Sequence, residues 1–77
     1  MKVTLYTKKD CGLCEKAERA VRVIHKTTGF DLEVVDIDGD TAAYDRYWAR
    51  IPVLLVEGKE VAAAPIDEAR LRAVLTA

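Results

Sequence analysis

The sequence lacks the features that are typical of membrane proteins, secreted proteins and nucleic-acid-binding proteins. It has no apolar run of membrane-spanning length. Because its first residues are strand-like, we expect no signal peptide. Its 12 basic and 13 acidic residues give a net charge of −1, without a charged tail or the basic stripe of a nucleic-acid-binding protein. We therefore expect a soluble, cytoplasmic monomer that binds neither nucleic acid nor membranes.

Histidine and cysteine, which build most metal and nucleophilic sites, are also scarce. The one histidine, His25, lies on a predicted helix, eleven residues beyond the second cysteine. At 1.5 Å per residue this separation is roughly 16 Å along a continuous helix, too far for direct cooperation with the cysteines. Its place near the helix end favours an interaction with the helix dipole instead.

What remains is the composition of an ordinary globular domain. Hydrophobic residues make up 51% of the chain and charged residues 32%, which argues against disorder. There are no internal repeats, linkers or low-complexity segments. We expect residues 1–77 to form one domain, close to the lower size limit at which a hydrophobic core suffices.

The hydrophobic pattern predicts four strands and three helices. Periods of two residues indicate strands and periods near 3.6 residues indicate helices, while Gly, Pro and Asp mark their ends. In chain order we expect a strand over Val3–Thr7, a helix from Cys11 that stops at Thr27–Gly29, a strand over Leu32–Ile37, a helix capped by Asp40, strands over Val53–Val56 and Val61–Ala64, and a helix capped by Asp67.

This order, β-α-β-α-β-β-α, predicts an α/β fold. The first two strands are joined through a helix and should be parallel, with a right-handed crossover. The last two are joined by the tight turn Glu57–Glu60 and should form an antiparallel hairpin. We expect a four-stranded mixed sheet with helices on both faces.

The short second helix carries most of the aromatic residues. Ala43 and Tyr47, and likewise Tyr44 and Trp48, are four residues apart and share one helix face. An aromatic platform of Tyr44, Tyr47 and Trp48 is the alternative, but helical spacing favours packing of this face into the core.

The two cysteines, Cys11 and Cys14, stand two residues apart at the start of the first helix. A ring this small removes little chain entropy, so redox chemistry or metal binding explains the pair better than a structural disulfide. At a helix N-terminus, free N–H groups and the positive dipole end stabilise a thiolate at the first cysteine. We therefore predict Cys11 as the nucleophile and Cys14 as the resolving thiol.

The segment Tyr6–Cys11, followed downstream by Ile51-Pro52-Val53 at the start of a strand, resembles the thioredoxin superfamily, and the chain's shortness resembles its glutaredoxin branch. The resemblance implies a thioredoxin-like fold and a cis Ile51–Pro52 bond beside the active-site disulfide, with the Ile51 backbone pairing with substrate. It also implies a substrate-binding role for Lys8, near the nucleophile and the glutathione carboxylate, and for Asp67 at the start of the last helix.

The chain departs from glutaredoxins at three places, one of which is Arg50, where the usual residue two positions before the proline is threonine. Gly12-Leu13 replaces the Pro-Tyr that glutaredoxins commonly carry between the cysteines. Ala62-Ala63-Ala64 replaces a Gly-Gly pair whose backbone closely approaches glutathione, and a Cβ hinders such an approach. We therefore expect only weak glutathione-dependent activity.

These residues favour a thiol-disulfide oxidoreductase that reduces protein or glutathione mixed disulfides through Cys11 and Cys14, needs no cofactor, and takes glutathione as a possible co-substrate. Two alternatives stay open. A metal or iron–sulfur protein would need a dimer or exogenous thiols, because one C-x-x-C supplies only two ligands. A redox-inert adaptor would keep the fold and lose the substrate groove.

Overall fold

The alternating residues of the first strand place its side chains on two sides of a sheet. Val3 and Leu5 are fully buried on one side, and Tyr6 packs on the other. The computed structural model describes residues 1–76. Its elements, in chain order, are β1 (Lys2–Thr7), α1 (Gly12–Thr28), β2 (Asp31–Asp36), the 3₁₀ turn η1 (Ile37–Gly39), α2 (Thr41–Tyr47), β3 (Val53–Val56), β4 (Lys59–Ala63) and α3 (Glu68–Leu75).

The four strands lie in the order β2-β1-β3-β4. β1 pairs with β2 in parallel and with β3 antiparallel, and β3 pairs antiparallel with β4. The predicted parallel pairing of the first two strands and the predicted antiparallel hairpin are therefore confirmed. In the hairpin turn, Glu57 and Gly58 have φ angles of 51° and 78°, which is the left-handed backbone of a two-residue turn.

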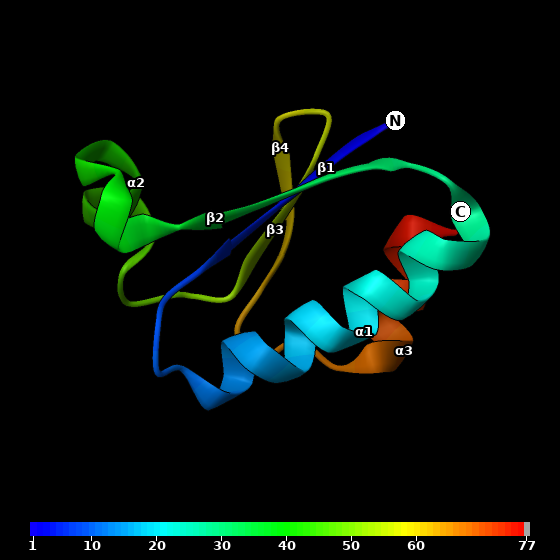
Figure 1. The fold of residues 1–77 in the computed structure, drawn as a ribbon, viewed down its shortest axis with the longest axis horizontal. Helices are drawn as coiled ribbons and strands as arrows, with labels where there is room; N and C mark the ends of the chain where they lie inside the picture. Colours follow the sequence, from blue (N-terminus) through cyan, green and yellow to red (C-terminus); the bar gives the residue numbers. More distant parts are fainter. Residues whose placement is uncertain (77) are drawn as a thin grey trace.

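Helices cover both faces of the sheet, as predicted (Figure 1). The face under α1 and α3 has eight buried residues, here called the α1/α3 core: Val3, Leu5, Val21, Ile24, Phe30, Leu54, Leu71 and Leu75. The face under α2 has five, here called the α2 core: Ile37, Ala43, Tyr47, Val53 and Leu55. No helix among residues 1–76 is both long and apolar enough to cross a membrane.

Capping residues stand at the helix ends where the sequence predicts them, Gly29 after α1, Asp40 before α2 and Asp67 before α3. Gly29 follows α1 with a φ of 72°, and its N–H donates to the His25 carbonyl. The Asp40 side chain accepts a hydrogen bond from the Ala43 N–H at the start of α2. The Asp67 side chain does the same for the Arg70 N–H at the start of α3.

The bounds of three strands, β1, β2 and β4, differ from the prediction by one or two residues, and those of β3 agree with it. β2 ends at Asp36 because the Asp36 carboxylate accepts from the Asp38 N–H at 2.8 Å and turns the chain. Ile37, predicted as the last strand residue, is instead buried in η1. β4 begins two residues earlier than predicted, at Lys59, because the short turn lets Lys59 pair with Val56.

The prediction that all the aromatic residues of α2 pack into the core is wrong. Ala43 and Tyr47 are buried, whereas Tyr44 is 39% exposed and Trp48 60% exposed. α2 is only seven residues long and rests on the sheet through one i, i+4 pair. The other pair is rotated by one residue, about 100°, around the helix and lies outside that contact.

Candidate functional site

The cysteine pair lies where the chain passes from β1 into α1. Cys11 is the N-cap of α1, with extended backbone angles (φ −112°, ψ 106°), and Cys14 stands in the first turn. Their Cα atoms are 5.2 Å apart and the two residues form a disulfide. The separation lies in the normal range for bridged cysteines, so the helix start holds both residues in position for this bond.

The two sulfurs differ in environment. The Cys14 N–H donates a hydrogen bond to Cys11 Sγ at 3.2 Å. Cys11 is half-buried, while Cys14 is only 2% exposed. The Cys11 sulfur therefore has a backbone hydrogen-bond donor and partial access to solvent, whereas Cys14 is enclosed.

The residues before Cys11 shape the approach to it. Asp10 has a φ of 61°, a left-handed conformation that Asp tolerates better than most residues, and turns the chain into the helix. Lys8 Nζ lies 3.4 Å from Asp38 Oδ2. The ammonium of Lys8, a predicted substrate-binding group, therefore already has an acidic partner on η1.

Strand register brings the Ile51–Pro52 segment to the same end of the sheet. Tyr6 pairs with Val53, so the residues after β1 and those before β3 leave the sheet together. The predicted cis Ile51–Pro52 bond is present. The Ile51 N–H, however, donates to the Tyr47 carbonyl at 3.1 Å, which leaves the Ile51 carbonyl for the predicted pairing with substrate.

A second proline segment lies beside the first. Ala63 pairs with Val53, and the Ala64 N–H donates to the Arg50 carbonyl at 3.1 Å. The Ala64–Pro65 bond is also cis, and Arg50 forms an ion pair with Glu60. The alanines at the predicted glutathione region thus adjoin the segment that carries Pro52, and Asp67 follows them as the cap of α3.

The metal alternative would need ligands beyond this chain. Among residues 1–76, no group of three or more His, Cys, Asp or Glu side chains is arranged to hold a metal ion. The ring of His25 instead packs against Phe30, with centroids 5.0 Å apart.

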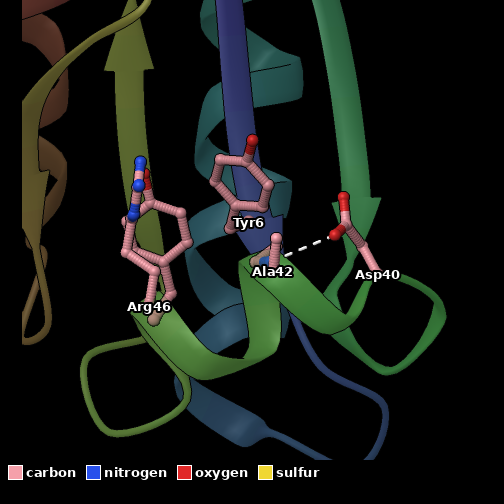
Figure 2. Close-up of a pocket in the computed structure, with 6 residues that line it drawn as sticks. Tyr6, Asp40, Ala42 and Arg46 are labelled. Atoms are coloured by element: carbon pink, nitrogen blue, oxygen red, sulfur yellow. Dashed lines mark hydrogen bonds between the residues drawn. The ribbon is translucent and has the colours of Figure 1, made fainter.

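Sequence reasoning missed a pocket beside α2 (Figure 2). Tyr6 and Tyr47 stack there with ring centroids 4.6 Å apart, next to Asp40 and Arg46. Burial, then the neighbouring Tyr47 and Asp40, raise the pKa of Tyr6. The signal in the sequence is only the alternation along β1, which points Tyr6 away from Val3 and Leu5 and toward α2.

Comparison with known proteins identifies the family of this chain. A family model described as a glutaredoxin-like domain (DUF836) matches residues 2–76. The chain belongs to this family. An uncharacterized protein of Mycobacterium tuberculosis is 30% identical over 76 residues, covering 92% of this chain and 78% of the relative.

Solved structures agree with this assignment. A protein from X. campestris is 37% identical with a TM-score of 0.78, covering 96% of this chain and 95% of that one. A thioredoxin from Fasciola hepatica is 26% identical with a TM-score of 0.70, covering 97% of this chain and 77% of that one. The chain is a divergent glutaredoxin-like protein with the predicted thioredoxin-like α/β fold, and the Cys11–Cys14 pair fits a redox role.

Proposed function

We propose that this protein is a thiol-disulfide oxidoreductase that uses Cys11 and Cys14. The observation that carries the proposal is the asymmetry of the pair at the start of α1. Cys11 is only half-buried and its sulfur accepts a hydrogen bond from the Cys14 N–H, while Cys14 is buried. An accessible thiolate beside a sheltered second thiol is the arrangement that exchange with a resolving cysteine requires.

The exchange proceeds in two steps from the reduced protein. Cys11 thiolate attacks one sulfur of a substrate disulfide, so that a Cys11–substrate disulfide forms and the other substrate sulfur leaves as a thiolate. Cys14 then loses its proton and attacks Cys11 Sγ, which releases the second substrate thiolate and closes the Cys11–Cys14 disulfide. The substrate gains two electrons and the protein loses two. Glutathione or another thiol reductant returns them.

The segments at the same end of the sheet supply the substrate site in this proposal. The Ile51 carbonyl pairs with an extended substrate segment, and Pro52 offers no N–H that would compete for it. Lys8 contributes positive charge, which is shared with Asp38 at 3.4 Å. Asp67, at the start of α3, contributes a carboxylate to the substrate site.

Two features support protein disulfides over glutathione mixed disulfides as substrates. Leu13, between the cysteines, is 53% exposed and offers an apolar contact to a protein surface. A substrate carboxylate would have to compete with Asp38 for the Lys8 ammonium. Together with the alanines at Ala62–Ala64, these features make turnover of glutathione mixed disulfides slower than turnover of protein disulfides.

A reduction assay with matched substrates and variants tests the function. Wild-type protein should reduce insulin disulfides faster than a small glutathione mixed disulfide at equal concentration. Cys11→Ser should abolish both activities. Cys14→Ser should accumulate a mixed disulfide on Cys11, because the resolving thiol is gone, and mass spectrometry detects the adduct.

Two results would count against the proposal. An adduct that forms on Cys14 in Cys11→Ser but not on Cys11 in Cys14→Ser would reverse the roles of the cysteines. Reduction of neither substrate by folded wild-type protein, with both thiols free at the start, would favour the redox-inert adaptor.

A further inference from the structure

The pocket beside α2 lies on the opposite face of the sheet from α1 and α3. Its volume is about 150 Å³. An engineered protein cavity of about this volume accommodates one benzene molecule, so the pocket has room for a ligand of roughly six non-hydrogen atoms. The residues that line it are Tyr6, Asp40, Ala42, Ala43, Arg46 and Tyr47.

Two opposite charges face this pocket without neutralising each other. Figure 2 shows Asp40 and Arg46 on either side of Tyr6, with the polar ends of the three side chains pointing the same way. Within residues 1–76 neither Asp40 nor Arg46 takes part in an ion pair. Asp40 Oδ1 accepts from the Ala43 N–H at 3.1 Å, which leaves Oδ2 available as an acceptor.

Tyr6 adds a fixed hydrogen-bond donor between the two charges. Its ring stacks on Tyr47 with a centroid distance of 4.6 Å, so its position does not depend on a ligand. The hydroxyl carries its proton at neutral pH, because the ordinary tyrosine pKa is about 10 and burial raises the pKa of Tyr6 further. The small side chains of Ala42 and Ala43 leave the space beside the ring open.

We propose that this pocket binds a small zwitterion of the α-amino acid type. The ligand carboxylate accepts hydrogen bonds from the Arg46 guanidinium and the Tyr6 hydroxyl. Its ammonium donates to Asp40 Oδ2. Charge-assisted hydrogen bonds of both signs then recognise one ligand, and alanine, with six non-hydrogen atoms, matches the volume.

The proposal is independent of the thiol chemistry, so its test uses binding alone. Isotope-labelled wild-type protein, with the disulfide intact, is titrated with L-alanine, propionate and ethylamine, and amide resonances are followed by NMR. L-alanine should give saturable shifts at Tyr6, Ala43 and Arg46 and should bind at least fivefold more tightly than either single-charge probe. The absence of saturable shifts, or equal affinity for propionate, would overturn the proposal.

Two variants and a matched control tie the binding to the pocket. Asp40→Asn removes the charge but retains a capping oxygen for α2, and Arg46→Gln removes the cation. Each should weaken L-alanine binding about tenfold, the effect of losing one charge-assisted hydrogen bond. Asp45→Asn makes the same charge change on the same helix outside the pocket and should stay within twofold of wild type. Equal weakening by Asp40→Asn and Asp45→Asn would contradict a specific site.

Discussion

The two faces of the sheet share the same strands and differ in what covers them. α1 and α3, together 25 residues long, bury eight side chains in the α1/α3 core. α2 is 7 residues long and buries five in the α2 core, with two stacked tyrosines at its edge. The face with long helices is closed and apolar, while the face with the short helix keeps an open pocket and exposed aromatic residues.

This comparison assigns different contributions to the two faces. Removal of apolar area from water supplies most of the favourable free energy of folding, so the α1/α3 core should dominate stability. The α2 face tolerates charge, as at Asp40 and Arg46, because α2 does not cover the whole sheet. Recognition can therefore develop on the α2 face without disturbing the larger core.

Adjacent leucines on β3 give the largest expected effect. Leu54 points into the α1/α3 core and is fully buried, and Leu55 points to the α2 core and is 9% exposed. Leu54→Ala should lower the free energy of unfolding by about 2–5 kcal/mol. Leu55→Ala should lower it less, because the open side of the face lets neighbours and water fill the space. Urea denaturation measures both, and equal losses would contradict a dominant α1/α3 core.

Alkaline pH should lower the stability of the folded chain through Tyr6, which lies on the α2 face. Its pKa is raised above the ordinary tyrosine value of about 10, chiefly by burial. The folded chain therefore holds this proton more tightly than the unfolded chain, and stability decreases as pH rises above that value. Tyr6→Phe should reduce this alkaline loss, measured as the melting temperature against pH. Tyr44→Phe, exposed on α2, is the control and should leave the loss unchanged.

Trp48 should give the smallest effect on stability. It is the C-cap residue of α2 and is 60% exposed, so truncation leaves no cavity. Trp48→Ala should change the free energy of unfolding by no more than about 0.5 kcal/mol, within the range of ordinary surface substitutions. A loss as large as that of Leu54→Ala in the same urea titration would mean that Trp48 packs into the α2 core after all.

Much of the fold is predictable because its signals are local. Gly29, Asp40 and Asp67 each end or cap a helix through bonds to residues within four positions, so sequence spacing alone reveals them. The Cys11–Cys14 pair is equally local, since both residues lie in one helix start. The predicted end of β2 is wrong. Ile37 is a residue type that favours strands, whereas the Asp36 side chain caps a turn at that point.

The aromatic residues and the pocket depend on tertiary distances instead. Helical spacing places Tyr44 and Trp48 on one face but does not give the width of the sheet surface that α2 can reach. Tyr6 and Arg46 line one pocket only because β1 and α2 pack together, through the stacking of Tyr6 on Tyr47. The Ile51 N–H bond to Tyr47 likewise depends on how the chain leaves α2.

Cys11 is both the N-cap of α1 and one half of the disulfide, which has a consequence for the evolution of this chain. Cys11 Sγ is the side-chain acceptor that caps α1, a position where oxygen-bearing residues such as Ser, Thr, Asp and Asn are preferred. Selection for helix stability alone would therefore favour replacing this sulfur with an oxygen. Every such replacement removes the thiol, so the proposed function, and not the stability of α1, accounts for a cysteine at this position.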